Sequence, residues 1–158
     1  MNSWEYDFPV GKTLILEQDG AICGVHFVRR LETEGRGFPE AVQAETPLLA
    51  RAAEQLREYF AGQRREFDLP LNLQGTAFQQ ACWQALLAIP FGETRSYKQQ
   101  AEFIGNPKAC RAVGLANNRN PVSIIVPCHR VLGHNGSLVG YGGGLEVKRA
   151  LLELETNA

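Results

Sequence analysis

The sequence predicts an α+β fold built from two successive domains. Residues near the N-terminus include runs of apolar and β-branched residues typical of paired strands, whereas the second half contains short helices with recognisable N-terminal caps. Between these patterns, the polar stretch Asn72–Gly75 has the composition of a linker. We therefore expect a small N-terminal α/β domain at residues 1–74 and a mostly helical C-terminal domain at residues 75–158.

The composition is that of an ordinary globular protein, with 158 residues of which 44% are apolar. No apolar run is long enough to span a membrane, and the N-terminus lacks the basic and apolar segments of a secretory signal. None of the four cysteines belongs to a C-x-x-C pair, so we expect a reduced, cytoplasmic protein with free thiols. These cysteines are Cys23, Cys82, Cys110 and Cys128.

Charge is distributed unevenly along the chain, although the net charge is only −1. Residues 1–90 carry 8 Lys and Arg against 12 Asp and Glu, a balance of −4. Residues 91–158 carry 8 against 5, a balance of +3. The net charge argues against a strongly basic nucleic-acid binder, but a polyanion would prefer the second part of the chain.

A β-hairpin is expected in the N-terminal domain. Thr13–Glu17 and Ile22–Val28 are rich in apolar and β-branched residues, and Gln18–Gly20 between them has the composition of a turn. Charges, glycines and a proline over Leu31–Glu45 predict a surface loop.

The first clear helix is expected to begin after Thr46, a capping residue, with Pro47 at the first helical position. Its apolar residues fall on one stripe, and Gly62 is the expected end. Phe67–Leu71 is then expected to return as a short strand. The stripe comprises Leu48, Leu49, Ala52, Ala53, Leu56, Tyr59 and Phe60.

Two capping boxes mark helices in the C-terminal domain. Thr76 with Gln79, and Ser96 with Gln99, have the spacing at which each side chain binds the other residue's backbone N–H group. The first of these helices should bury an apolar stripe. That stripe comprises Phe78, Cys82, Ala85, Leu86 and Ile89.

A helix-turn-helix is predicted around Gly105, which ends the helix that follows Ser96. Asn106 is expected to cap the next helix, with Pro107 at its first position and its end near Asn118. An ordinary helical hairpin is the simpler alternative, but a basic helix without acidic residues favours nucleic acid. Its basic residues are Lys108 and Arg111, and Ala112, Gly114 and Ala116 are small enough to allow a partner close approach.

A thiol and an imidazole follow the apolar run Ile124–Val126, which is expected to be a short buried strand. Pro127 keeps the preceding residue extended and cannot donate a ladder hydrogen bond, so strand pairing should end there. Cys128 would then lie where a strand gives way to a turn, with His129 as the nearest base for forming a thiolate. A cysteine after an apolar run is commonly an inert core residue, and these residues alone leave both possibilities open.

A glycine-rich loop and a final helix complete the chain. Six glycines from Gly133 to Gly144 predict a loop around Tyr141 whose backbone can approach a ligand closely. The helix is expected over Leu145–Leu154, where Glu155 ends it and opposes the helix dipole unless it is frayed and solvated. Its inward residues are expected to be Val147, Ala150, Leu151 and Leu154.

Several motifs together resemble those of the O6-alkylguanine-DNA alkyltransferases, the methylated-DNA–protein-cysteine methyltransferases of DNA repair. The likeness covers residues 75–155 with almost no gap, whereas residues 1–74 match only in length and general pattern. The matching motifs follow one order at one spacing. They are Phe91–Thr94, Ser96–Tyr97, Gly105–Lys108, Arg111–Gly114, Pro127–Val131 and Tyr141–Gly144.

The resemblance implies catalytic roles for five residues. Cys128 is the alkyl acceptor, and His129 activates it through a bound water while Glu155 polarises the imidazole. Asn120 lies in the turn that joins the recognition helix to the active site. Tyr97 donates a proton to the purine as the alkyl group leaves.

The resemblance also implies residues that bind DNA and the flipped base. Arg111 is the finger that enters the base stack when the damaged nucleotide leaves it. Many members have a serine at the position of Gly142, so the loss of a side-chain donor here could change substrate preference. The other implied DNA contacts are Tyr97, Lys98, Asn106, Lys108, Ala112 and Gly114, and the implied pocket comprises Val131, Tyr141, Gly142 and Gly143.

The implied fold has a ribonuclease H-like N-terminal domain, followed by a helical domain with a helix-turn-helix and a Pro-Cys-His-Arg active-site strand or turn. The implied partner is double-stranded DNA that contains O6-alkylguanine, and also O4-alkylthymine, with no cofactor, metal or membrane. Some relatives bind zinc in the N-terminal region, but residues 1–74 contain no convincing ligand set. A monomer in solution is expected, with cooperative binding along DNA left open.

The chemistry fits this interpretation. An alkyl carbon on O6 is buried in the duplex, so the nucleotide must leave the stack, and the thioether product has no carbonyl for water to attack. Each molecule is therefore expected to act once. A cysteine hydrolase that uses Cys128 and His129 with turnover, and a non-catalytic sensor of alkylated DNA, are the alternatives. Replacement of Cys128 by Ser would leave a sensor intact but would abolish transfer by an alkyltransferase.

Overall fold

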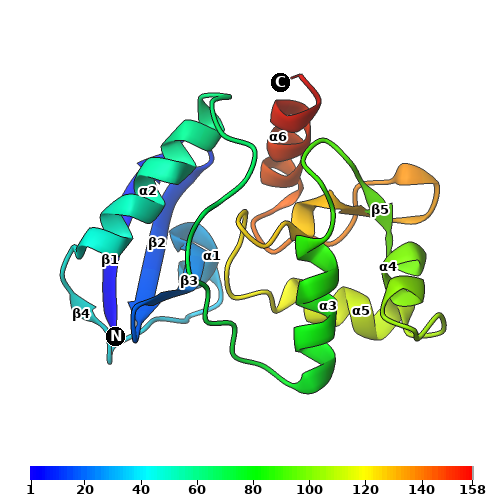
Figure 1. The fold of residues 1–158 in the computed structure, drawn as a ribbon, viewed down its shortest axis with the longest axis horizontal. Coiled ribbons are helices and arrows are strands. Elements are labelled where there is room, and N and C mark those ends of the chain that lie inside the picture. The colour runs from blue at the N-terminus through cyan, green and yellow to red at the C-terminus, as the bar shows by residue number, and fades with distance from the viewer. Residues whose placement is uncertain (158) are drawn as a thin grey trace. The chain divides into compact units, whose positions relative to one another are not determined.

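The computed structural model describes residues 1–157 and forms two compact units, Met1–Leu73 and Gln74–Ala158. Each unit has its own strands and helices (Figure 1). The predicted α+β class is confirmed. Within the described residues, no helix combines the length and the apolar character needed to cross a membrane.

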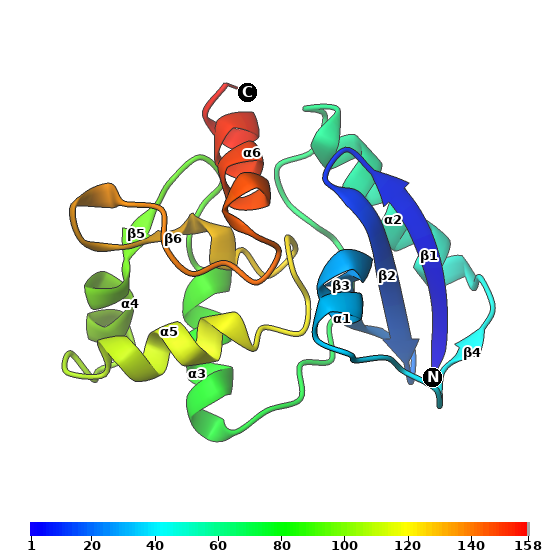
Figure 2. The same cartoon turned by 180° about the vertical axis from the view of Figure 1, so that it is seen from behind.

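The first unit is a four-stranded sheet in the order β3-β2-β1-β4, with helix α2 across one face (Figures 1 and 2). The antiparallel pair β2 and β3 is the predicted hairpin, and Asp19 and Gly20 in its turn have positive φ angles. Thr46 accepts a hydrogen bond from the Leu49 N–H and caps α2, as predicted. The elements are β1 (Asn2–Phe8), β2 (Gly11–Gln18), β3 (Ala21–Phe27), α1 (Val28–Thr33), β4 (Val42–Gln43) and α2 (Pro47–Phe60).

Two expectations for this unit were wrong. Leu31–Glu45 is not wholly a surface loop, because α1 extends into its start and β4 lies near its end. Helix α1 is short and buries only Leu31, so it leaves no helical pattern in the sequence. Phe67–Leu71 forms one bridge, between Leu71 and Ile22, rather than a strand.

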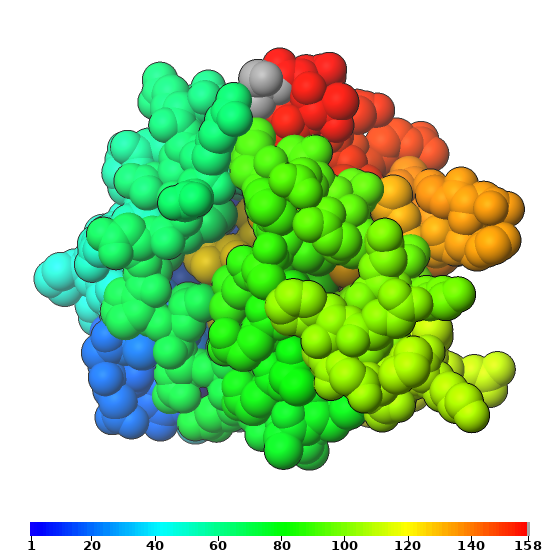
Figure 3. All heavy atoms as spheres, turned by 45° about the vertical axis from the view of Figure 1, so that its right-hand side comes forward, coloured from blue at the N-terminus to red at the C-terminus, as the bar shows by residue number. Residues whose placement is uncertain are grey.

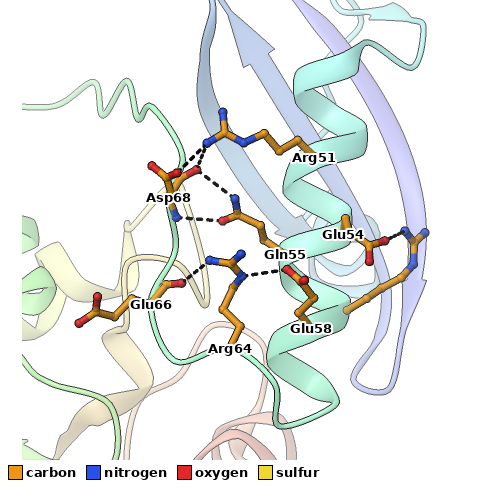
Figure 4. Close-up of polar contacts among 8 residues, drawn as sticks. Arg51, Glu54, Gln55, Glu58, Arg64, Glu66 and Asp68 are labelled. Carbon is orange, nitrogen blue, oxygen red and sulfur yellow. Dashed lines mark hydrogen bonds and ion pairs between the residues drawn. The ribbon is translucent and has the colours of Figure 1, made fainter.

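Side chains of α2 hold this returning segment (Figure 4). Gln55 exchanges two hydrogen bonds with the backbone of Asp68, at 3.0 and 2.9 Å, and Arg51 also donates to that residue. Farther along, Arg64 donates to Glu58 of α2 at 2.9 Å. The backbone of Asp68 is therefore satisfied by a side chain instead of a strand ladder.

Short helices build the second unit, together with two-residue strands β5 and β6 that pair in parallel. Both predicted capping boxes are present, with hydrogen bonds of 2.9–3.1 Å between Thr76 and Gln79 and between Ser96 and Gln99. The elements are α3 (Ala77–Leu87), β5 (Arg95–Ser96), α4 (Tyr97–Phe103), α5 (Cys110–Asn118), the 3-10 turn η1 (Cys128–Arg130), β6 (Val131–Leu132), the 3-10 turn η2 (His134–Gly136) and α6 (Leu145–Thr156).

Helices α4 and α5 form the predicted helix-turn-helix, and buried polar contacts join them to α3. The side-chain amides of Gln100 and Asn117 exchange hydrogen bonds of 2.9 and 2.8 Å. Trp83 of α3 donates through Nε1 to the carbonyl of Ala116 at 2.9 Å. These bonds fix the position of α5 relative to its two neighbours.

The start of α5 differs from the prediction. Asn106 does not cap this helix with its side chain, and its carbonyl instead accepts a hydrogen bond from the Ala109 N–H at 3.0 Å. Pro107 and Lys108 therefore lie in a turn, and the helix begins at Cys110.

Candidate active site

The apolar run before Cys128 is a buried turn, so the predicted strand at Ile124–Val126 was wrong. Ile124 has a φ angle of 72°, which no strand contains. Asn120 closes the turn, because Oδ1 accepts from the Val122 N–H at 3.0 Å and Nδ2 donates to the Val126 carbonyl at 2.8 Å. The β-branched composition reflects burial alone, since Val122 to Val126 are at most 6% exposed.

The same asparagine reaches the sulfur. Asn120 Nδ2 lies 3.3 Å from Cys128 Sγ, so it can donate a hydrogen bond to a thiolate. Burial and the negative charge of the Cys128 thiolate both raise the pKa of Tyr97, the first residue of α4. This phenol is therefore close enough to sense the sulfur's charge, and it remains protonated at neutral pH.

The two residues after Cys128, His129 and Arg130, form a buried ionic network with Glu155. His129 Nε2 lies 2.7 Å from Glu155 Oε2, and Arg130 donates to both oxygens of Glu155, at 2.8 and 3.0 Å. None of these three residues is more than 6% exposed. Glu155 lies within α6, which continues to Thr156, so the frayed and solvated alternative does not hold.

The network determines which nitrogen of His129 carries the proton. An ionised carboxylate only accepts hydrogen bonds, so Nε2 carries the hydrogen that points at Glu155. Burial lowers the pKa of His129 although Glu155 opposes this shift, so the imidazole is neutral at neutral pH. Nδ1 then has a free lone pair, and it makes no hydrogen bond to any residue from 1 to 157.

Lys148 is a buried residue at this site that the sequence interpretation missed. Its side chain is fully buried, and Nζ donates to the carbonyls of Val131 and Val139 at 2.6 and 2.8 Å. These bonds tie β6 to the glycine-rich loop. A signal existed in the sequence, because Lys148 and Glu155 are seven residues apart and therefore lie on one face of α6.

The inward face of α6 is rotated relative to the prediction. Leu151 is buried as expected, but Ala150 is exposed, and Val147 and Leu154 are only half-buried. The prediction assigned the inward face by hydrophobicity. Two charged residues, Lys148 and Glu155, take part of that face because hydrogen bonds satisfy them.

The predicted pocket residues lie in β6 and in the glycine-rich loop that follows it. Val131 is fully buried, and Tyr141, Gly142 and Gly143 are half-buried. A cleft of about 540 Å³ opens beside this loop, lined by residues 94–99, Cys110 and residues 132–136, so Cys128 lies outside its lining. In Figure 3 the orange loop and the yellow-green turn between α4 and α5 both stand out at the surface.

The predicted DNA-binding residues fall into two groups. Most are exposed on α4, on α5 or in the turn between them, but Gly114 is half-buried, and a Cβ there would lie 3.8 Å from the Tyr97 ring. Ala116 is buried as well, so only one of the three small residues faces outward. Leu115, which was not predicted, is 62% exposed on the same helix. The exposed predicted residues are Lys98, Asn106, Lys108, Arg111 and Ala112.

The second unit thus combines a helix-turn-helix with a cysteine that an asparagine amide contacts, and the residue after this cysteine is the histidine of a buried histidine–glutamate pair. This combination defines the class of nucleic-acid-binding proteins that carry a potentially reactive thiol. The family model described as 6-O-methylguanine DNA methyltransferase, ribonuclease-like domain, matches residues 5–73, and the DNA binding domain of the same family matches residues 77–157. The chain belongs to the 6-O-methylguanine DNA methyltransferase family.

Individual relatives agree with this assignment. The methylated-DNA–protein-cysteine methyltransferase of Mycobacterium leprae is 50% identical over 150 residues, which cover 94% of this chain and 88% of that protein. The Mycobacterium bovis protein of the same name is 64% identical over 104 residues, which cover 66% of this chain and 63% of that protein. The crystal structure of Mycobacterium tuberculosis OGT in complex with DNA matches with a TM-score of 0.86 and 46% identity, covering 99% of this chain and 94% of that one.

Proposed function

We propose that this protein repairs duplex DNA by moving the alkyl group of O6-alkylguanine onto Cys128, once per molecule. Two observations carry the proposal: Asn120 Nδ2 lies 3.3 Å from the sulfur of Cys128, and the next residue, His129, is paired with Glu155 in the core of the second unit. O4-alkylthymine is a second substrate in this proposal. We expect the protein to act as a monomer in the cytoplasm, on double-stranded DNA and without a cofactor.

The transfer step is a substitution at a saturated carbon. The Cys128 thiolate forms a bond to the alkyl carbon, and the bond from that carbon to O6 of guanine breaks. Nδ1 of His129 takes the thiol proton through a bridging water, and Asn120 stabilises the thiolate by donating to the sulfur. The departing guanine anion takes a proton from Tyr97, whose raised pKa keeps it in the protonated form that can donate. Solvent returns that proton to Tyr97.

DNA binding relies on the exposed side of α5. Arg111 and Ala112 face outward there, so an arginine can enter the stack while a small neighbour allows the backbone to approach. Moving the alkylated base out of the duplex costs roughly a few kcal/mol, and an inserted side chain offsets part of that cost. Val131, Tyr141, Gly142 and Gly143 hold the extruded base, and Gly142 contributes no side-chain donor.

The product explains why one molecule acts once. A thioether has no carbonyl for water to attack, so the alkylated cysteine is not regenerated. A cysteine hydrolase would instead form a thioester and turn over. It would leave the helix-turn-helix without a role.

Transfer of a labelled methyl group tests the proposal. The protein is mixed with duplex DNA that carries one labelled O6-methylguanine, and label should appear on a peptide containing Cys128. The Cys128→Ser variant should bind the same duplex without taking label, whereas Cys110→Ser, altered at another half-buried thiol, should take label normally. Label on another residue, or none, would refute the assignment of Cys128.

A further inference from the structure

The guanidinium of Arg130 is buried in the second unit and makes hydrogen bonds through three of its nitrogens. Its Nε and Nη2 donate to the two oxygens of Glu155, and Nη1 donates to the carbonyl of Ile89 at 2.7 Å. The guanidinium also lies 5.7 Å from the ring centroid of Phe91. Residues from two segments, α6 and the loop after α3, therefore fix the orientation of this side chain.

The carboxylate of Glu155 is shared between two donors. Oε2 accepts from His129 Nε2 and from Arg130 Nη2, while Oε1 accepts from Arg130 Nε. Arg130 therefore supplies the positive charge that balances Glu155, and His129 does not have to become imidazolium for the carboxylate to be paired. The fork of the guanidinium also holds the plane of the carboxylate, which in turn holds the imidazole ring.

Three charged groups act on His129. Glu155 of α6 favours the protonated ring, whereas Arg130 of η1 and Lys148 of α6 disfavour it, in addition to burial. Arg130 bonds directly to the one group that favours protonation, whereas Lys148 bonds to the carbonyls of Val131 and Val139. Of these two cations, Arg130 is therefore placed to control the protonation state of His129 through Glu155.

We propose that Arg130 is a positioning residue for alkyl transfer: it pairs with Glu155 and so keeps His129 as the neutral tautomer with hydrogen on Nε2 and a free lone pair on Nδ1. This inference rests on the proposed function for its catalytic consequence. The effect on His129 itself does not depend on that function, and it can be measured in a protein that transfers nothing.

Nitrogen NMR of His129 tests the proposal directly. In protein with labelled histidine and Cys128→Ser, the ring nitrogens of His129 should show the Nε2–H tautomer and a pKa below that of an ordinary histidine. With Arg130→Met added, Glu155 is unbalanced, and His129 should titrate about one pH unit or more higher. Arg149→Met, which changes an exposed arginine of α6, should leave the titration in place.

A second variant separates charge from geometry and serves if Arg130→Met does not fold. Arg130→Lys keeps the positive charge but cannot bind both carboxylate oxygens and Ile89 together. His129 should titrate close to its original position, while single-turnover transfer from methylated duplex should slow by about tenfold, because the imidazole is held less firmly.

Two results would overturn the inference. One is a folded Arg130→Met protein in which His129 keeps its original tautomer and titration. The other is an Arg130→Lys protein that transfers alkyl groups at the original rate. If no variant transfers alkyl groups at all but the NMR shift appears, the proposed function fails and the role of Arg130 toward His129 stands.

Discussion

Lys148 and Tyr97 donate to the same backbone oxygen, the carbonyl of Val139, at 2.8 and 3.3 Å. One of these residues belongs to α6 and the other begins the first helix of the helix-turn-helix. The glycine-rich loop is thereby fixed at its middle by the same phenol that we propose donates a proton to guanine. The shape of the loop and the position of the proton donor are therefore coupled.

Lys148→Met should destabilise the second unit and slow alkyl transfer. It would remove the lysine donor from the Val131 carbonyl and would leave the Val139 carbonyl with only its hydrogen bond from Tyr97, at a cost of about 2 kcal/mol or more in the free energy of unfolding. Denaturant unfolding and single-turnover transfer measure the two effects, with Arg149→Met as the exposed control. Unchanged stability would show that these bonds do not hold the loop.

Asn120→Asp should reduce the reactivity of Cys128. The carboxylate keeps the acceptor for the Val122 N–H but replaces the donor to Sγ with negative charge, so the thiolate is disfavoured. The rate of alkylation by iodoacetamide at neutral pH should fall about tenfold or more. Asn118→Asp, at the end of α5, is the matched control, and equal rates in both variants would contradict the role of Asn120.

Arg111→Ala should separate DNA handling from thiol chemistry. Transfer from methylated duplex should fall by about tenfold or more, because nothing then fills the stack when the base leaves. Alkylation of Cys128 by iodoacetamide should be unchanged, since Arg111 is exposed on α5. A parallel loss of both activities would indicate that Arg111 supports the fold instead.

The Gln100–Asn117 pair should show strong coupling in stability. Either single change to Leu would remove the hydrogen bonds between the two buried amides, at a cost of about 1–3 kcal/mol, although Gln100 Nε2 also donates to the carbonyl of Cys82. The double change removes both polar groups, so much of this loss should be recovered. Equilibrium unfolding of the four proteins gives the coupling energy, and additive losses would contradict the paired geometry.

Acid should weaken the first unit through His26. Burial lowers the pKa of this residue to about 4, with Arg36 and Arg30 adding to the effect, and its ring lies against Phe38. Because the unfolded chain binds the proton more readily, stability is fully present above about pH 6.5 and is lost as the pH falls toward 4. His26→Leu should flatten this dependence in a pH series of unfolding curves. An unaltered slope would assign the acid sensitivity to other groups.

The sequence predicted those parts of the fold that depend on hydrogen bonds between residues close together in the chain. Thr46, Thr76 and Ser96 each accept the backbone N–H three residues on, so the starts of α2, α3 and α4 could be predicted from short sequence patterns. Ile124–Val126 could not, because the turn is closed by Asn120, whose side-chain contacts depend on the tertiary structure. Hydrophobicity predicts burial, and it does not distinguish a buried turn from a buried strand.

The site divides in a similar way. Cys128 and His129 could be proposed as a nucleophile and its base from their place after an apolar run, and the roles of Tyr97 and Glu155 came from the resemblance to a known family. Lys148 was missed because an isolated lysine is normally expected in solvent, and only the carbonyls of the loop make its burial favourable. The burial of Glu155 could not be predicted either, because it depends on the hydrogen bonds that its oxygens accept from His129 and Arg130.

The most direct test of the central claim is intact mass spectrometry of the protein after exposure to excess duplex that contains O6-methylguanine. If Cys128 accepts the alkyl group irreversibly, each molecule should gain one methyl group on Cys128, an equal number of guanines should be repaired, and no further repair should follow. An unmodified Cys128, or many guanines repaired by each protein molecule, would contradict that claim.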